Sequence, residues 1–195
     1  MEVNRFIECA SDPTHWEKKA LSLRKAAEAV WDLFEKEWLK GVSTRPLDID
    51  VFQNELAENL LSNSQLLYGL SAECALKGIL IKKDPKSIQF TTIVDGTRNV
   101  TSAEISKKGN SSIDTHNLEK LAKEAGVLKP ETEDGIKEIL AYCTEIVIWR
   151  GRYPVPLKTD GGFRFRGKLP GVAFVHYFRD VFDPFLDELF ETLKN

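Results

Sequence analysis

Apolar residues recur at three- and four-residue steps through long parts of the chain, which is the spacing of one helix face. The first such stretch covers residues 14–41. Thr14 and Glu17 have the spacing of a capping box at its start, and Gly41 is a typical helix end. Between them the apolar positions fall on one side: Trp16, Ala20, Leu23, Ala27, Val30, Trp31 and Phe34. The pattern predicts a long amphipathic helix.

A second stretch runs from about residue 50 to residue 83, ahead of Pro85. Its apolar positions form a broad stripe: Leu56, Leu60, Leu66, Leu67, Leu70, Cys74, Leu76, Ile79, Leu80 and Ile81. A helix that is apolar over so wide an arc is typical of the centre of a bundle. We therefore expect this helix to be the central one.

The helical periodicity fails between about residues 87 and 112. Two short β-branched runs flank the Asp95-Gly96 pair there, and such a pair is a common turn between antiparallel strands. This segment therefore predicts a small β-hairpin insertion.

The remaining patterns are helical. Residues 116–125 suggest a short helix that Thr115 caps and Gly126 closes, and a further helix runs from Pro130 to near Gly151. The last helix starts at about Gly171, and its Asp183-Pro184 step indicates either a kink or the start of a new helix. The sum is one domain, residues 1–195, that is mainly α. We expect an up-and-down helical bundle of four to five helices with a small β-hairpin insertion.

Composition narrows the class of protein. Of the 195 residues, 42% are hydrophobic and 29% charged, which is ordinary for a globular chain. The net charge of -3 excludes binding to polyanions by bulk charge, so any contact with nucleic acid must come from a local patch. No stretch reaches the roughly 18 apolar residues of a membrane span, and the N-terminus lacks a signal-peptide pattern. We expect a cytoplasmic protein without a membrane partner.

No spacing of cysteines and histidines resembles a metal site. Cys9, Cys74 and Cys143 form no CxxC pair, and we interpret them as buried free thiols. No Walker loop, dinucleotide-binding loop or nucleophile motif is present. We therefore expect neither a metal nor a cofactor. Whether the chain is an enzyme stays open, and the absence of such motifs leans against it.

Two groups of charged residues lie on apolar stripes. Glu73 sits beside the most apolar stripe of the chain, and Lys77 follows one helical turn later, where it can pair with Glu73. The alternative is an exposed pair at the edge of the stripe. Arg150 continues the stripe of the helix that follows Pro130, so we expect it to pair with Glu73, or otherwise to anchor the fold. Arg152 then points elsewhere and is free to contact phosphate.

His116 follows a predicted helix cap, where a histidine either packs and caps or donates to a carboxylate or carbonyl. It completes three motifs that occur in order along the chain. SAECALKGIL contains Glu73 and Lys77, THNLEKL contains His116, and WRGRYP contains Arg150, Arg152 and Tyr153.

These motifs resemble those of HEPN domains, and the resemblance covers about residues 50 to 154. It implies a helical bundle, frequently dimeric, from a toxin–antitoxin, stress or phage-defence setting, with a nucleotidyltransferase as a possible partner. Several HEPN domains are metal-independent ribonucleases with an Arg followed by four to six residues and a His. No arginine stands at that spacing before a histidine here, so the chain is more similar to the non-nuclease branch, which implies binding of a nucleotide or RNA. The residues that this resemblance assigns to the ligand are Glu73, Lys77, His116, Arg150, Arg152 and Tyr153.

A basic loop at about residues 157–169 adds a second candidate. Between residues 150 and 168, six Lys or Arg residues stand against one acid, Asp160, with aromatic residues between them. Such a mixture suits single-stranded nucleic acid. The candidate contacts are Arg152, Arg164, Arg166 and Lys168. A solvated loop is the alternative, as is a loop that meets the acidic last helix of a neighbouring subunit.

The leading hypothesis is therefore a HEPN-like protein that binds a nucleotide or RNA. Two alternatives remain open. One is a structural or protein-interaction module, in which the same charged residues fix the register of the helices. The other is an atypical metal-independent ribonuclease.

Overall fold

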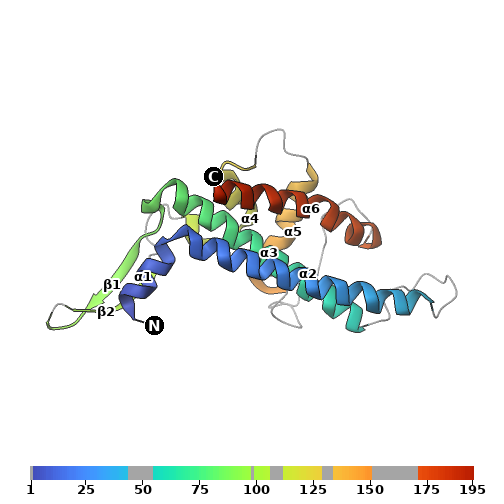
Figure 1. Cartoon of the computed structure of the whole chain (residues 1–195), viewed down its shortest axis with the longest axis horizontal. Helices are drawn as coiled ribbons and strands as arrows, with labels where there is room; N and C mark the ends of the chain where they lie inside the picture. The colour runs from blue at the N-terminus through green and yellow to red at the C-terminus, as the bar shows by residue number, and fades with distance from the viewer. Residues whose placement is uncertain (1, 44–54, 98, 106–111, 129–133, 151–170) are drawn as a thin grey trace, which may run out of the picture.

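The computed structural model describes residues 2–43, 55–97, 99–105, 112–128, 134–150 and 171–195. This part of the chain is a helical bundle with a two-stranded antiparallel hairpin, as predicted (Figure 1). Its α-helices are α1 Val3–Ser11, α2 Pro13–Ser43, α3 Glu55–Lys83, α4 Leu118–Glu124, α5 Asp134–Glu145 and α6 Gly171–Lys194. The shorter elements are the 3-10 turns η1 Pro85–Ser87 and η2 Ser112–Asp114, the π-helical η3 Ile146–Arg150, and the strands β1 Phe90–Val94 and β2 Val100–Ile105.

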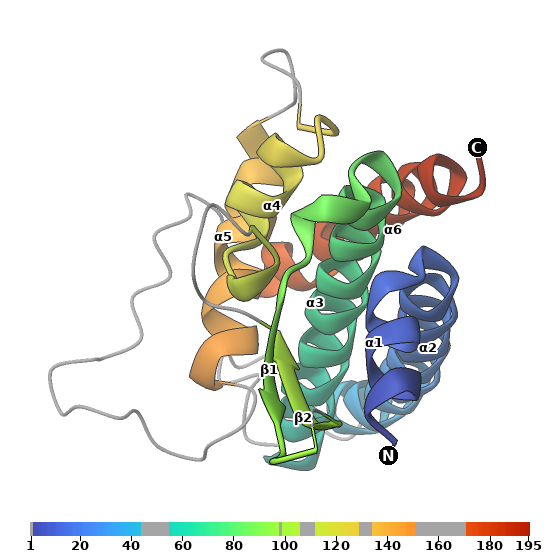
Figure 2. The same ribbon diagram turned by 90° about the vertical axis from the view of Figure 1, so that its left-hand side faces the viewer.

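Helix α3 is the centre of the bundle, which confirms the prediction from its wide apolar arc. It packs against α2, α4, α5, α6 and η3. Figure 2 shows α3 between α2 on one side and α4 and α5 on the other, with α6 behind it. A side chain near the middle of α3 is therefore covered by neighbours on most sides.

Helices α2 and α3 approach closely because small residues line the face of α3 that meets α2. Ala57, Ser64, Ser71 and Gly78 follow one another at seven-residue steps and are all buried. Ser64 Oγ donates to the carbonyl oxygen of Ala27 at 2.7 Å, and Ser71 Oγ donates to that of Ala20 at 2.9 Å. The two hydroxyl groups thus fix the register of the pair in addition to filling the interface.

An aromatic cluster fills the space between α2, α3 and α6. The Trp31 ring stacks on Phe178 with ring centroids 6.0 Å apart, and Tyr68 meets Trp31 edge-on. Phe182 lies beside Phe178. Aromatic pairs of this kind add to the stabilisation from burial alone.

The ends of the helices differ from the predictions in three places, one being that α2 continues past Gly41 to Ser43. Helix α2 begins at Pro13, and Asp12 accepts hydrogen bonds from the backbone N–H and the hydroxyl of Thr14, so Thr14 is not the cap. Helix α4 begins at Leu118, and its cap is the side chain of Asn117. The amide oxygen of Asn117 satisfies the first free N–H groups of the helix as well as the predicted hydroxyl of Thr115 would. Gly126 closes α4 at φ +68°, as expected.

The hairpin lies within the predicted insertion, and Asp95 caps its loop by accepting from the backbone N–H groups of Thr97 and Asn99. Helix α6 continues through Pro184, so the Asp183-Pro184 step is an interior proline and not the start of a new helix. Helix α1 was not predicted. It has no buried residue and is held by contacts with β2 and α2.

None of the helices in the described ranges combines the length and apolar character needed to cross a bilayer.

Candidate functional site

The middle of α3 carries a buried ion pair. Lys77 Nζ donates to Glu73 Oε1 at 2.6 Å, and each side chain is only 8% exposed. The predicted pairing is thus confirmed, and the alternative of an exposed pair at the edge of the stripe is wrong. The pair is buried because α3 lies at the centre of the bundle and neighbouring elements cover this face. The sequence alone does not show whether the face is covered or exposed.

His116 is the third member of this cluster. Its Nδ1 lies 3.0 Å from Glu73 Oε1 and 3.1 Å from Glu73 Oε2. A carboxylate only accepts hydrogen bonds, so Nδ1 carries the proton and donates it. In the neutral ring the second nitrogen, Nε2, then holds the lone pair. The side chain of His116 is 47% exposed, which gives the cluster an edge that solvent reaches.

The loop before α4 holds His116 against α3. His116 precedes the cap residue Asn117 and so lies outside the helix, not within it as predicted. Thr115 Oγ1 accepts from the backbone N–H of Asn117 at 3.1 Å. Thr144 Oγ1 on α5 accepts from the backbone N–H of Leu118 at 3.0 Å. The imidazole is therefore positioned by α3, α4 and α5 together.

The cluster carries no net negative charge that would repel an anion at its open edge. The Glu73 carboxylate is neutralised by Lys77, so the remaining charge is that of His116, which is neutral or positive. A buried carboxylate that accepts from Nδ1 also orients the ring, as in sites where a histidine exchanges protons with a substrate. The arrangement suits either phosphate binding or proton transfer at Nε2.

Cys74 lies next to this cluster but is not a nucleophile at neutral pH. Burial, followed by the negative charge of Glu73, raises the pKa of its thiol to about 11. Burial also raises the pKa of Cys143. The three cysteines are free thiols, as expected, although Cys9 and Cys74 are only partly buried. Within the described ranges, no group of three His, Cys, Asp or Glu side chains is placed to hold a metal ion.

The third motif begins where α5 ends. There the chain widens into the π-helical η3, which packs on α3 and ends at Arg150. Gly69 makes this contact possible, because a Cβ on it would lie 2.9 Å from Val147 Cγ2. Short π-helical turns within helices occur frequently at functional sites. Of the third motif, the structure describes only the backbone of its first two residues, 149 and 150, which end η3 against α3.

Several predicted residues lie outside the part of the chain that the structure describes. They are the side chain of Arg150, and Arg152, Tyr153, Arg164, Arg166 and Lys168 together with the basic loop. Their assignments, including the pairing of Arg150 with Glu73, stay predictions.

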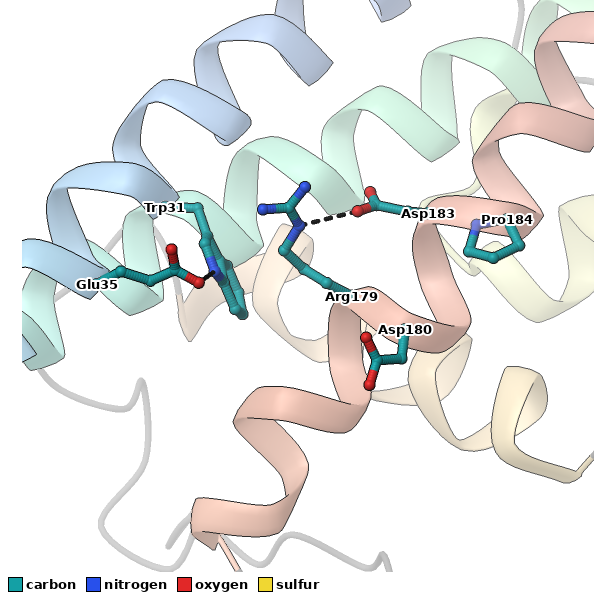
Figure 3. A pocket seen from close by; sticks show the side chains of 6 residues that line it. All are labelled: Trp31, Glu35, Arg179, Asp180, Asp183 and Pro184. Carbon is teal, nitrogen blue, oxygen red and sulfur yellow. Dashed lines mark hydrogen bonds and ion pairs between the residues drawn. The ribbon is translucent and has the colours of Figure 1, made fainter.

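A second polar site was not predicted. Helices α2 and α6 form an open pocket of about 380 Å³, lined by Trp31, Glu35, Arg179, Asp180, Asp183 and Pro184 (Figure 3). The sequence separates these two helices by more than a hundred residues, so no local pattern indicates that they share a pocket.

No protein-family model, curated protein or solved structure matches this chain.

Proposed function

We propose that this chain is a HEPN-like helical-bundle protein that binds the phosphate of a nucleotide or RNA at the cluster of Glu73, Lys77 and His116. The observation that carries the proposal is the uneven burial of the three residues. Glu73 and Lys77 already neutralise each other inside the bundle, yet Glu73 also holds an imidazole that is 47% exposed. An ion pair that only fixes the register of helices needs no such third, solvent-exposed member.

A phosphate at this edge would accept a hydrogen bond from protonated His116. Binding would then favour the imidazolium, because the anion stabilises the charged ring and Glu73 holds the opposite nitrogen. Arg150, Arg152 and Tyr153 are proposed to complete the site, since η3 brings the end of α5 onto α3. The basic loop, with Arg164, Arg166 and Lys168, would extend it along a nucleic-acid strand.

The resemblance supplies the rest of the proposal. It favours a homodimer, a nucleotidyltransferase as a partner, and a cytoplasmic role in a toxin–antitoxin, stress or phage-defence system. Light scattering coupled to size exclusion tests the dimer, and a monomer at all concentrations would contradict that part alone.

The binding test is calorimetric titration with a panel of nucleoside mono- and triphosphates and with short single-stranded RNAs. We expect at least one of them to bind the native chain and to lose most of its affinity in His116→Ala. The matched control is His15→Ala, because His15 is similarly exposed, at 49%, and also faces a carboxylate, that of Asp12. Flat traces with every ligand, or equal losses in both variants, would contradict the proposal.

The hydrogen bond from His116 Nδ1 to Glu73 favours a second candidate, a metal-independent ribonuclease. In that case Nε2 would take the proton of the RNA 2′-hydroxyl, the 2′-oxygen would attack phosphorus, and the 5′-oxygen would leave with a proton from solvent. The products would carry a 2′,3′-cyclic phosphate. Cleavage in the presence of a chelator, lost in His116→Ala, supports this candidate, and intact RNA after long incubation contradicts it.

A further inference from the structure

The β-hairpin has one edge that no described part of the chain covers. It is a sheet of two strands, so each strand has an outer edge whose backbone N–H and C=O groups point away from the other strand. Helix α1 lies beside β2 and contacts it (Figure 2). The outer edge of β1 makes no backbone hydrogen bond to any described residue, and residues 91–94 of this strand are all exposed.

Strand β1 lacks the features that normally prevent an edge strand from pairing. Natural edge strands are commonly protected by a charged side chain, a proline or a β-bulge. The sequence of β1, Phe-Thr-Thr-Ile-Val, contains no charge and no proline. The register of the hairpin shifts between Ile93 and Val94, and the extra residue, Thr101, belongs to β2, which also carries Glu104. Strand β1 is therefore a regular, uncharged strand of residues that favour β structure.

Apolar side chains are exposed where the hairpin extends from the bundle. At its base, Phe90 and Ile105 pack against a small core of buried isoleucines. The turn lies at the end far from the bundle (Figure 1). Near the turn, Ile93 is 62% exposed and Val94 is 56% exposed, and Val100, which faces Val94 across the hairpin, is 41% exposed. An anchored hairpin thus presents apolar groups next to an unprotected edge.

We propose that β1 pairs antiparallel with β1 of a second copy of this chain, so that two hairpins form one four-stranded sheet. The strand complements itself about a two-fold axis at Thr92. Thr92 then lies opposite its own copy, and Phe90 lies opposite Val94. Thr91 lies opposite Ile93. Threonine pairs and pairs of an aromatic with a β-branched residue are among the favourable cross-strand pairs.

The shape of the chain suits this arrangement. Antiparallel pairing places the projecting end of each hairpin beside the anchored base of the other, and the two bundles lie at opposite ends of the sheet. The exposed Val94 of one copy then contacts Phe90 of the other, which packs on its own core. Two strands of this length bury little surface, so we expect a dimer that dissociates on dilution.

The charges beside β1 are complementary in the same arrangement. Residues 82–86, which precede the strand, are three lysines, one aspartate and a proline, with a net charge of +2, and Asp95 follows the strand. Antiparallel pairing brings the basic segment of one copy to the same end of the sheet as Asp95 of the other. Arg98, farther along the turn, lies outside the described residues. Opposite charges at both ends favour this orientation of the two copies.

This proposal rests on the homodimer of the proposed function and names its contact. It does not depend on the phosphate site, because β1 shares no residue with the cluster of Glu73, Lys77 and His116.

The test is sedimentation velocity of the full chain over a series of concentrations, with circular dichroism to verify that each variant is folded. We expect a monomer–dimer equilibrium in the native chain. Thr92→Lys places like charges opposite each other at the two-fold axis and should raise the dissociation constant of the dimer about tenfold. Ser102→Lys is the matched control, because Ser102 is an exposed residue of β2 in the same hairpin. This variant should keep the native dissociation constant within about twofold.

A disulfide tests the register of the two strands. Thr92→Cys should form a covalent dimer under mild oxidation, since opposite residues of antiparallel strands lie within the Cα separation that a disulfide spans. Ser102→Cys and the native chain, with its three cysteines, are the controls and should not form this dimer.

Dimerisation that is equally strong in Thr92→Lys, or crosslinking that is equal in Thr92→Cys and Ser102→Cys, would overturn this contact and leave the homodimer standing. A native chain that is monomeric at every concentration would overturn both, and would leave the edge of β1 to a strand of another protein. Neither result bears on the phosphate site, which the nucleotide and RNA titrations test separately.

Discussion

Replacing Glu73 by glutamine tests whether the cluster is as buried as the structure has it. The substitution keeps the shape of the side chain and an oxygen acceptor for Lys77 and His116, but it removes the negative charge. Lys77, only 8% exposed, then keeps a buried charge without a counter-charge. Breaking one partner of a buried ion pair costs about 3–5 kcal/mol of unfolding free energy. We expect a value near the lower end, about 3 kcal/mol, because the amide oxygen still accepts a hydrogen bond.

The assay is urea and thermal unfolding followed by circular dichroism. For a chain of this size a loss of about 3 kcal/mol lowers Tm by about 6–12 °C. The double variant Glu73→Gln, Lys77→Met removes both charges and should recover most of the loss, because no unpaired charge is then left in the interior. Glu124→Gln is the control, because Glu124 pairs with Lys120 at 3.9 Å on the surface. This variant should change the free energy of unfolding by less than about 1 kcal/mol. If Glu73→Gln is as mild as Glu124→Gln, or if the double variant is less stable than the single one, the argument from burial fails.

Two other predictions follow from the same structure, and a third follows from the sequence. Gly69→Ala should destabilise the fold by about 1–3 kcal/mol in the same unfolding assay, because the Cβ of the alanine would lie 2.9 Å from Val147 Cγ2. A change below about 0.5 kcal/mol, as for a surface substitution, would contradict this. Cys74 should resist iodoacetamide at pH 8 in the native chain and react in urea, since burial raises the pKa of the folded thiol to about 11. The stability that the buried thiol contributes is present below its unfolded pKa and is lost as the pH rises toward 11. Fast alkylation of the native chain at pH 8 would contradict this. Arg152→Ala should leave Tm unchanged but weaken RNA binding and flatten its dependence on salt, and an unchanged affinity would remove Arg152 from the site.

The sequence predicts the long elements well because their signals are local. The apolar periodicity of α2, α3 and α6 and the Asp95-Gly96 pair depend only on neighbouring residues, and the structure places helices and a hairpin there. Helix α1 carries no comparable signal. Its residues stay partly exposed, and Phe6 contacts Phe90 of β1 across the chain, so the helix depends on a tertiary contact.

The candidate site could be predicted only in part. The Glu73 and Lys77 pair is visible in the sequence because four residues form one helical turn. Its burial is not, since that depends on what covers α3. The contact from His116 spans 43 residues, and no local pattern sets it. The acidic pocket likewise needs the packing of α6 on α2, which brings Arg179 over Trp31.

The most direct test of the phosphate site is the ¹⁵N spectrum of the imidazole nitrogens in histidine-labelled protein, titrated with nucleotides and short RNA. The account predicts that Nε2 of His116 shifts toward the protonated form as ligand is added, with Nδ1 still bonded to Glu73, while the resonances of His15 stay in place. Resonances of His116 that do not move with any ligand, or that move together with those of His15, would contradict it.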